Sequence, residues 1–531
     1  MADTAKRPLG AQISHMLKAR GVDVIFGIPG VHNQEMYRGI EEAGITHVLA
    51  RHEQGAGFMA DGYARATGKP GVAYVITGPG LCNIMTPMGQ AYSDSVPMLV
   101  ISSCLDETAA RRGQLHQMKD QRGAADTVCD WSEEARTAAA AYGLIDRALA
   151  EFEMGRPRPK HIQVPIGVLE AMAEPARAGD RNDTSICAKP AQIQSLAEVL
   201  AQAKRPLFVC GGGAASAPAG LATQVAEMFG AAVFTTYAGR GVVAADYPLL
   251  FGSTLARASS AEVFAQADAV VAIATELAEV DLWRAQLGQT CPLYRVDIDP
   301  ESLRDPHVAE QAILGDAGVF LDGLLQSGVT PGATDWTSGE VSGARRRWRA
   351  EIDSEYPGIL PVADALRACL SEDVMIYSDM TQFAYAAKEA WDMNRPGHWH
   401  HPFGFGTLGY ATPAAIGGAI GRPGQRTMAI IGDYGFHYTM AELGVAVELG
   451  LPLPIILWDN GKLGAIEASM TGAQIAPNAV IARNPDFVKL AQAFGAHTAA
   501  PETLAEMQSA VQEAFTADGP TLIYVTPNIA A

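Results

Sequence analysis

Residues 430–470 read IIGDYGFHYTMAELGVAVELGLPLPIILWDNGKLGAIEASM. Apolar runs at 428–431 and 455–458 predict two short buried strands, and apolar residues at helical spacing predict a helix over 439–449 between them. A strand, a helix and a second strand in this order are typical of a parallel βαβ unit. This stretch therefore predicts an α/β fold built on a parallel sheet.

Polar residues follow both predicted strands: Gly432-Asp433 after the first, and Asp459-Asn460-Gly461 after the second. Because the carboxyl ends of parallel strands meet at one edge of a sheet, Asp433 and Asn460 should lie close together. Carboxylate and amide oxygens suit a Mg²⁺ ion that carries phosphate groups. The alternative is a pair of ordinary strand-to-helix turns, in which Asp, Asn and Gly are common. The fragment alone leaves both interpretations open.

The same residues resemble the metal-binding motif of the thiamine diphosphate-dependent enzymes, which is Gly-Asp-Gly followed after a spacer by Asn-Asn. Tyr434 replaces the third residue of Gly-Asp-Gly, and Asp459 replaces the first Asn. The resemblance implies that Asp433, Asn460 and the main-chain oxygen of Lys462 hold Mg²⁺. Tyr434 bears on how closely the main chain approaches the diphosphate, a role that Gly435 can take over.

Composition and charge exclude several classes of function. The chain has 531 residues, a size typical of about three domains. Its net charge of −19 argues against nucleic acid or an anionic membrane as a partner. Seven scattered cysteines without a C-x-x-C motif, several of them in or beside apolar runs, predict buried thiols in a reducing cytoplasm. The polar N-terminus lacks an apolar signal core, and no apolar run is long enough to cross a bilayer.

Strands alternate with helices in the N-terminal part, which is typical of a parallel, doubly wound sheet. Apolar runs predict strands at 22–26, 46–49, 72–76, 98–102 and 161–164. The segment RHEQGAGFMADGYAR at 51–65 begins where a strand gives way to a helix, and Glu53 lies at the start of that helix. A carboxylate in the first turn of a helix often only complements the helix dipole, so Glu53 by itself does not indicate catalysis.

Residues 51–65 and the segment TGPGLCN at 77–83 resemble the pyrimidine-binding part of the same family. The resemblance implies that Glu53 activates the cofactor and that Gly80 and Asn83 lie beside the aminopyrimidine. In that chemistry, a carboxylate shares a proton with N1′ and so favours the imino tautomer, whose nitrogen removes the C2 proton; the thiazolium then accepts the electrons that CO₂ leaves behind. A carboxylate among small apolar neighbours suits this task because burial raises its pKa.

The segment RRGQLHQMKDQ at 111–121 corresponds to a family loop that reaches the active site. His116 is a candidate for proton transfer and Gln117 for substrate contact, although a lone His is more often a surface or core residue. Ile76 stands where some decarboxylases of the family carry a catalytic His. That acid–base group is therefore missing from this chain.

The middle of the chain predicts a further sheet, with strands at 206–210, 231–235, 269–273 and 293–297. Three glycines follow the first of these strands, but the full G-x-G-x-x-G spacing of a dinucleotide fold is absent. Residues 235–252, TTYAGRGVVAADYPLLFG, resemble the central domain of the family, which binds FAD, ADP or neither. The sequence does not choose among these. Linkers are expected at 174–190 and 330–350, and the second runs into a charged helix expected at 344–353.

In the last third of the chain, a predicted strand at 374–378 ends in Asp379, which is either a diphosphate contact or a helix N-cap. The segment GFGTLGYATPAAI at 404–416 surrounds one large apolar residue with glycines, which permit a close approach of the main chain to a flat ligand. The alternative is a loop that enters a buried helix. The resemblance implies that Leu408 supports the bent cofactor and that Gly406 accepts a hydrogen bond from its 4′-amino group.

The resemblance covers nearly the whole chain and implies an α/β fold of three doubly wound domains with parallel sheets. These are a pyrimidine-binding domain at 1–175, a central domain at 190–330 and a diphosphate-binding domain at 350–531. It implies thiamine diphosphate and Mg²⁺ as cofactors, with the diphosphate beside Gly432, Gly435 and Phe436. It further implies a homodimer or homotetramer with active sites at the dimer interface.

The runs IPGVHNQEMYRGI and MGQAYSDSVPMLVISS are similar to the acetolactate synthase-like group, and most similar to decarboxylases of 5-guanidino-2-oxopentanoate, an arginine-derived 2-oxo acid. The expected reaction is non-oxidative decarboxylation of a 2-oxo acid to an aldehyde. One alternative is carboligation, as in acetolactate synthesis; another is a non-catalytic nucleotide-binding scaffold, which an intact set of Glu53, Leu408, Asp433 and Asn460 argues against. The candidates for substrate contact are Val31, His32, His116, Gln117, Phe405, Glu467 and Met470.

Glu467 is the candidate that would suit a guanidinium group, because a carboxylate accepts two parallel N–H bonds from it. The alternative is that Glu467 belongs to the solvated face of a predicted helix.

Overall fold

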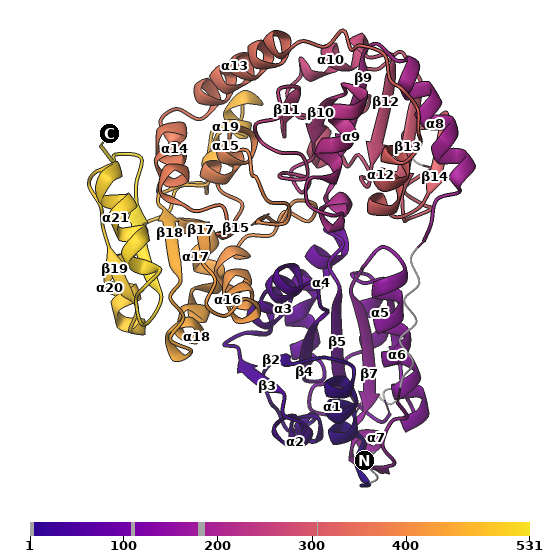
Figure 1. Ribbon diagram of the computed structural model, residues 1–531. Coiled ribbons are helices and arrows are strands. Elements are labelled where there is room, and N and C mark those ends of the chain that lie inside the picture. Colours follow the sequence, from indigo (N-terminus) through magenta and orange to yellow (C-terminus); the bar gives the residue numbers. More distant parts are fainter. Residues whose placement is uncertain (1–4, 108–111, 179–185, 305, 531) are drawn as a thin grey trace. The chain divides into compact units, whose positions relative to one another are not determined.

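The computed structural model describes residues 5–107, 112–178, 186–304 and 306–530, so position 111 of the predicted active-site loop lies outside the described residues (Figure 1). Three six-stranded sheets are present, with strand orders β3-β2-β4-β5-β7-β6, β11-β10-β9-β12-β13-β14 and β16-β15-β17-β18-β20-β19. Strand pairs in all three sheets are parallel. The predicted α/β class with three doubly wound parallel sheets is confirmed.

The first sheet has helices on both faces. Its strands are β2 (Val24–Gly27), β3 (Thr46–Leu49), β4 (Gly71–Val75), β5 (Met98–Cys104), β6 (Trp131–Glu134) and β7 (Lys160–Pro165). One face packs its core against α1 (Leu9–Ala19), α2 (Gln34–Glu42), α6 (Ala138–Met154) and α7 (Ile166–Glu170). The remaining helices are α3 (Glu53–Thr67), α4 (Pro79–Ser93) and α5 (Gln121–Asp126), with α4 in contact with both α3 and α5. A short antiparallel pair joins β1 (Arg7–Pro8) to β8 (Met172–Ala173).

The second sheet lies in the middle of the chain. Its strands are β9 (Pro206–Cys210), β10 (Ala232–Thr235), β11 (Leu250–Gly252), β12 (Ala269–Ile273), β13 (Leu293–Asp297) and β14 (Gln311–Leu314). Its main helices are α8 (Pro190–Gln202), α9 (Leu221–Phe229), α10 (Ser260–Gln266) and α12 (Ala317–Leu325). At Gly211, a Cβ atom would lie 2.1 Å from the carbonyl oxygen of Ala274. Close packing between strand-end loops therefore accounts for the first glycine of the run.

Helix α13 (Ser338–Glu355) begins inside the predicted linker at 330–350, so the second half of that linker is helical. A capping box starts the helix: the Thr337 hydroxyl accepts from the N–H of Glu340, whose carboxylate accepts from the N–H of Thr337. Trp348 is fully buried in the central core. The charged helix predicted at 344–353 is therefore present and extends further at both ends. The helix α14 (Ile359–Cys369) follows it.

The third sheet carries the predicted metal motif. Its strands are β15 (Met375–Ser378), β16 (Trp399–His400), β17 (Thr427–Gly432), β18 (Pro454–Trp458), β19 (His497–Ala499) and β20 (Thr521–Val525). Its helical segments are α15 (Gln382–Ala390), α16 (Ala411–Gly421), α17 (Asp433–Thr439), η2 (Met440–Glu442), α18 (Leu443–Glu448), α19 (Gly464–Gly472), α20 (Phe487–Phe494) and α21 (Leu504–Ala514). The helix predicted at 439–449 thus begins earlier, at Asp433, and is interrupted by a 3₁₀ turn. An acidic first residue complements the helix dipole and allows the helix to start directly after the strand.

The chain forms two compact units, and the first contains the N-terminal sheet together with residues 376–381 and 401–530. Inside this unit, α3 packs directly on α16. A Cβ atom at Gly62 would lie 1.9 Å from the carbonyl oxygen of Ala414, and one at Gly417 would lie 1.9 Å from that of Met59. The two helices therefore touch through their main chains, which only glycine permits.

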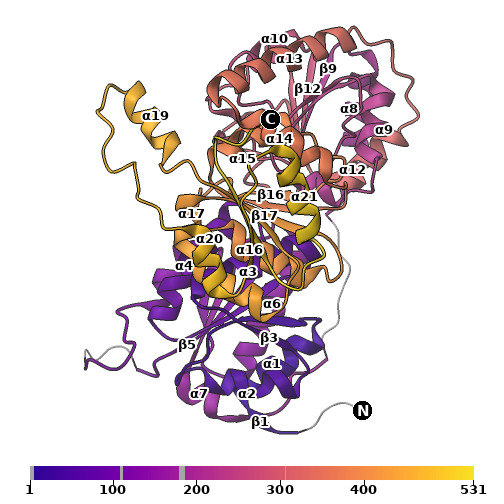
Figure 2. The ribbon, with the colours of Figure 1, turned by 90° about the vertical axis from the view of Figure 1, so that its left-hand side faces the viewer.

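Helix α19 and the segment after it stand away from the third sheet (Figure 2). Ile466, Ile475 and Ile481 are exposed there. All seven cysteines are free thiols, but the predicted burial is wrong for two of them, since Cys82 and Cys187 are exposed. Among the described residues, no helix combines the length and the apolar character that crossing a bilayer requires.

Candidate active site

Glu53 is the first residue of α3, and its side chain lies at the carboxyl edge of the first sheet. It is 8% exposed, and the Asn83 side-chain amide donates to its Oε2 at 2.8 Å. A Cβ atom at Gly80 would lie 3.4 Å from Glu53 Oε1 and 2.9 Å from Ile76 Cγ2. The first turn of α4 therefore brings Gly80 and Asn83 beside Glu53, and Gly80 also lies against Ile76, which follows β4.

Two histidine rings meet beside this group. The ring centroids of His32 and His116 lie 4.8 Å apart in an edge-on arrangement. Burial lowers the pKa of His32, and the neighbouring His116 lowers it further. The loop that carries His32 crosses Ile76, because a Cβ atom at Gly30 would lie 2.1 Å from Ile76 Cδ1. Two predicted residues from separate loops thus form one pair next to Ile76.

The backbone at His116 has a φ angle of +64°, which is uncommon for a residue other than glycine. Its carbonyl oxygen packs against Gly78, where a Cβ atom would lie only 2.4 Å away. Gln121, which the sequence did not single out, accepts a hydrogen bond from the Gly78 N–H at 2.8 Å. The loop is therefore fixed against the end of β4.

The other predicted substrate residues are less enclosed. Val31 is 63% exposed and Phe405 is 50% exposed. The Gln117 side chain accepts from the N–H of Gln114 and so turns back on its own loop. Glu467 forms an ion pair of 2.6 Å with Lys462.

At the carboxyl edge of the third sheet, two carboxylates share one amide. Asn484 Nδ2 donates to Asp433 Oδ2 at 2.7 Å and to Asp459 Oδ1 at 2.8 Å. Burial raises the pKa of Asp433, the nearby Asp459 raises it further, and the Asn484 bond opposes both. Asn484 follows an irregular stretch, and no local pattern in the sequence marks it.

The turn after β18 is ordered by its own side chains. Asp459 accepts from the Gly461 N–H at 2.9 Å and from the Tyr524 hydroxyl at 2.8 Å, and Asn460 accepts from the Lys462 N–H at 3.2 Å. Within the described ranges, no three His, Cys, Asp or Glu side chains converge as a metal site. A cation here would need amide and main-chain oxygens as well, and a buried carboxylate, an amide and a turn supply that chemistry.

Asp379 is fully buried and holds the main chain of a neighbouring loop. Its carboxylate accepts from the N–H groups of Met380, Gly409 and Ala411 at 2.8, 3.2 and 3.2 Å. Burial raises its pKa to about 7, although these donors oppose the shift. A Cβ atom at Gly435 would lie 3.0 Å from this carboxylate. Asp379 therefore holds the main chain that leads into α16, whose own N-cap residue is Tyr410.

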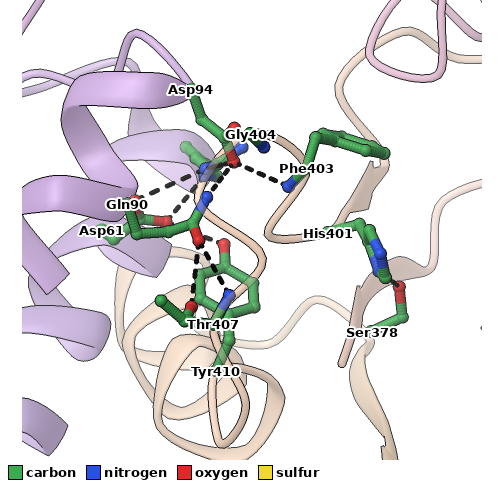
Figure 3. Close-up of polar contacts among 10 residues, drawn as sticks. Asp61, Gln90, Asp94, Ser378, His401, Phe403, Gly404, Thr407 and Tyr410 are labelled. Carbon is green, nitrogen blue, oxygen red and sulfur yellow. Dashed lines mark hydrogen bonds and ion pairs between the residues drawn. The ribbon is translucent and has the colours of Figure 1, made fainter. Parts of the chain in front are cut away.

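The loop at 403–410 includes Gly406 and Leu408 and is tied to α3 and α4 of the same chain. Figure 3 shows the side chains of Gln90, Asp94 and Asp61 pointing toward it. Asp94 accepts from the Gly404 N–H at 3.0 Å, and the Tyr410 hydroxyl donates to Asp61 at 2.7 Å. The sequence offered no indication of these contacts.

A second unpredicted contact runs in the opposite direction, from the third sheet to the start of α3. The Glu442 carboxylate accepts from the main-chain N–H groups of Arg51 and His52 at 3.1 and 2.9 Å. Burial raises the pKa of Glu442 to about 7, against these donors. A Cβ atom at Gly55 would lie 2.2 Å from the carboxylate, so a larger residue there would displace the Glu442 side chain.

Three protein-family models match successive parts of the chain. They are the N-terminal thiamine pyrophosphate (thiamine diphosphate) binding domain over residues 7–124, the central domain of these enzymes over 193–324, and the C-terminal thiamine pyrophosphate binding domain over 379–525.

The chain is also similar to whole proteins. A probable 2-ketoarginine decarboxylase of Pseudomonas aeruginosa, AruI, is 42% identical over 524 residues, which cover 97% of this chain and 93% of that protein. The large subunits of acetolactate synthase isozymes 2 and 1 of Escherichia coli K12 are each 29% identical, over 97% and 98% of this chain and 95% and 94% of their own lengths. The chain therefore belongs to the thiamine pyrophosphate enzyme family.

Proposed function

We propose that this chain catalyses the non-oxidative decarboxylation of a 2-oxo acid to an aldehyde, with thiamine diphosphate and Mg²⁺ as cofactors. The observation that carries the proposal is the environment of the Glu53 carboxylate. It is 8% exposed, and among the described residues Asn83 is its single hydrogen-bond donor, on Oε2. The other oxygen remains available to hold a proton at N1′ of the aminopyrimidine.

When bound, thiamine diphosphate supplies a carbon nucleophile and accepts the electrons released with CO₂. Glu53 shares a proton with the ring nitrogen, and Asn83 fixes the orientation of its carboxylate. Gly80 keeps α4 close enough to shield that carboxylate from water.

The His32–His116 pair is proposed to move protons on the substrate side, His116 as the catalytic partner and His32 as a substrate contact. Ile76, beside both histidine loops, cannot do so. A lowered pKa keeps His32 neutral at pH 7, and a neutral imidazole can accept one proton and donate another. The 4.8 Å ring separation lets the two rings act on one substrate group.

Asp433, Asn460 and the main-chain oxygen of Lys462 are proposed to hold Mg²⁺, with the diphosphate along Gly432, Gly435 and Phe436. The crowding of two carboxylates around Asn484 supports this, because a divalent cation relieves the repulsion that raises the pKa of Asp433. Asp379 acts on the same site indirectly, through the loop whose N–H groups it binds. FAD or ADP in the central domain stays a prediction.

The similarity to the 2-ketoarginine decarboxylase favours 5-guanidino-2-oxopentanoate, which is 2-ketoarginine, as the substrate. Glu467 is proposed to receive the guanidinium. Its present partner is Lys462, and a guanidinium replaces an ammonium favourably because its planar fork donates two bonds to one carboxylate. Val31, Gln117 and Phe405 complete the proposed substrate side.

Each active site is proposed to be shared by two chains. Glu53 and Asp61 are eight residues apart, so they are separated by about 12 Å along α3. Asp61 binds Tyr410, so the loop with Gly406 and Leu408 lies toward the far end of α3. N1′ and the 4′-amino group belong to one six-membered ring, so they are much closer to each other than Glu53 and Gly406 of a single chain. Glu53 of one chain and Gly406 of the other must therefore bind the ring. The smallest assembly is then a homodimer, and a homotetramer would be a pair of such dimers.

The second candidate is carboligation, in which the enamine left after decarboxylation of the same 2-oxo acid adds to a second carbonyl. It is favoured by the similarity to the acetolactate synthase large subunits over nearly their whole length.

Product analysis tests the proposal. The purified chain is supplied with thiamine diphosphate, Mg²⁺ and 5-guanidino-2-oxopentanoate, and CO₂, aldehyde and hydroxyketone are measured. 2-Oxopentanoate, which has the same carbon chain without the guanidinium, is the matched control. We expect CO₂ and free aldehyde in equal amounts, with a clear preference for the guanidino substrate. A hydroxyketone as the main product would establish the second candidate instead, and no CO₂ release from any of a panel of 2-oxo acids would overturn the proposal.

A further inference from the structure

We infer that Asp94 is a positioning residue for the loop at 403–410, and that it acts on the active site that is completed by the partner subunit. The inference rests on the proposed function, in which this loop supports the cofactor. Asp94 touches neither the cofactor nor the reacting atoms.

The carboxylate of Asp94 lies at the end of α4 and binds the main chain at the start of the loop. Its Oδ1 accepts from the Gly404 N–H at 3.0 Å, and its Oδ2 accepts from the Phe403 N–H at 3.3 Å. Its side chain is 5% exposed. Figure 3 shows Asp94 directed at these two residues. Two consecutive N–H groups of an otherwise irregular loop thus contact one buried side chain, and the Phe403 N–H is shared with the carbonyl oxygen of His401 at 2.9 Å.

Gln90, one turn earlier on α4, fixes the middle of the loop and is itself held by Asp94. Its Oε1 accepts from both the N–H and the hydroxyl of Thr407, at 3.3 and 3.0 Å. Its Nε2 donates to Asp94 Oδ2 at 2.8 Å. Thr407 lies between Gly406 and Leu408, so this bond sets the main chain at the proposed cofactor contacts.

Arg65 on α3 forms ion pairs with both carboxylates of the cluster. It donates to Asp94 at 2.8 Å and to Asp61 at 2.7 Å, and Asp61 in turn accepts from the Tyr410 hydroxyl. Every group within hydrogen-bond distance of the Asp94 carboxylate is therefore a donor. An aspartate satisfies four donors, whereas an asparagine would turn an NH₂ group toward some of them.

Asp94 follows α4, which packs with the N-terminal sheet, whereas the loop that it holds leads into α16, which packs with the third sheet. The helices α3 and α4 are joined at their first turns by Asn83 and Glu53 and at their last turns by Asp94 and Arg65. The two junctions are separated by about 16 Å along α4. A defect at Asp94 should therefore leave the Glu53 end of its own chain intact and impair the site that uses its own loop.

The first test is hydrogen exchange of the full chain carrying Asp94→Asn. We expect the amides of residues 403–407 to exchange about tenfold faster or more, while those of 51–56 are unchanged. Asp146→Asn is the matched control, because Asp146 also pairs with an arginine of the same domain, Arg20, but at the surface and away from the loop. Gln90→Met, which keeps the side-chain length but removes the bonds to Thr407 and to Asp94, should show a smaller effect of the same kind. Unchanged exchange at 403–407 in both loop variants would overturn the inference.

The second test uses mixed dimers of Glu53→Gln chains with Asp433→Ala chains, in which the intact site takes Glu53 from the second chain and the loop from the first. Asp94→Asn added to the Glu53→Gln chain should reduce the recovered turnover about tenfold or more. The same change added to the Asp433→Ala chain should leave the recovered turnover within about twofold. The reverse pattern, or equal loss in both, would mean that Asp94 supports only the fold of its own domain.

The two tests separate this inference from the proposed function. If the mixture of Glu53→Gln and Asp433→Ala chains recovers no turnover, the proposal of a shared active site is wrong. The hydrogen-exchange measurement then decides by itself whether Asp94 holds the loop.

Discussion

Glu53 and Glu442 are buried carboxylates at the start of α3 with opposite tasks. Glu53 keeps one oxygen without a donor among the described residues, which suits a group that shares a proton with a ligand. Both oxygens of Glu442 accept main-chain N–H groups, which suits a group that holds the helix start in place. The sequence predicted the first from its motif, but Glu442 resembles any acidic helix residue until its distant partners are known.

Replacing Glu53 by glutamine tests its task. The amide keeps the length of the side chain and can still accept from Asn83, so the variant should fold and bind thiamine diphosphate with Mg²⁺. It cannot share a proton with N1′, so C2 deuterium exchange of the bound cofactor should slow and turnover should fall by about 10²–10⁴-fold. Quenched-flow NMR and a decarboxylation assay measure these quantities. If exchange and turnover both stay at the wild-type level, Glu53 is only a helix-start carboxylate.

Glu442 should make stability depend on pH. Its folded pKa of about 7 lies above its usual 4.5, so between these values the folded chain keeps a proton that the unfolded chain has released. Stability is therefore lost as pH rises through this window, by on the order of 3 kcal/mol at most. Glu442→Gln removes this pH-dependent loss of stability. The Tm of the variant minus that of the wild type should therefore increase from pH 5 to pH 8.

Glu448→Gln is the control for that comparison, since Glu448 pairs with Arg51 at the surface nearby. Its Tm difference from the wild type should stay flat over the same pH range. A flat difference for Glu442→Gln as well would mean that this carboxylate is ionised in the folded chain throughout the range.

At the scale of elements, the apolar runs predicted strand positions accurately. The strands β3, β9, β12 and β13 have the predicted bounds. Helices were harder where burial is not confined to one stripe. In α17, Asp433, Gly435 and Phe436 are all buried, so no polar face marks the helix. In α13 the helix itself was predicted, from 344, but the capping box at Thr337 starts it six residues earlier, at Ser338.

The contact of α3 with α16 gives a prediction for this scale. Gly62→Ala should destabilise the chain and reduce activity, because the new methyl group would lie 1.9 Å from the main chain of α16 and must push the helices apart. Gly143→Ala in α6 is the matched control, since no atom lies within 4 Å of its new methyl group. It should stabilise the chain by up to about 1 kcal/mol through helix propensity alone. Thermal unfolding of both variants tests this, and equal Tm values for the two would contradict it.

At the scale of the whole molecule, the sequence could relate Glu53 to Asp433 only because both match motifs of one family. The contacts of Asp94 with Gly404 and of Glu442 with Arg51 join residues more than three hundred positions apart. No periodicity or local spacing marks such pairs, since each member looks like an ordinary polar residue of its own element. They follow only from how α3 and α4 meet the loops of the third sheet.

The shared active site predicts complementation between two inactive proteins. Glu53→Gln and Asp433→Ala homodimers should each be nearly inactive, whereas a subunit-exchanged mixture should recover about a quarter of wild-type turnover, because half of the dimers are mixed and each holds one intact site. Native mass spectrometry verifies the exchange. Verified mixed dimers without turnover would show that each site is built within one chain.

The packing of α3 also restricts how the sequence can change in length. Glu53 at its first residue and Asp61 and Arg65 further along meet different partners, so one inserted residue between them would turn the far half by about 100° and advance it by about 1.5 Å. Tyr410 and Asp94 would then lose their partners on the helix. By contrast, residues 473–479 after α19 are exposed along their whole length. Insertions and deletions among homologous chains should therefore be absent from α3 and frequent after α19, which an alignment of such chains would reveal.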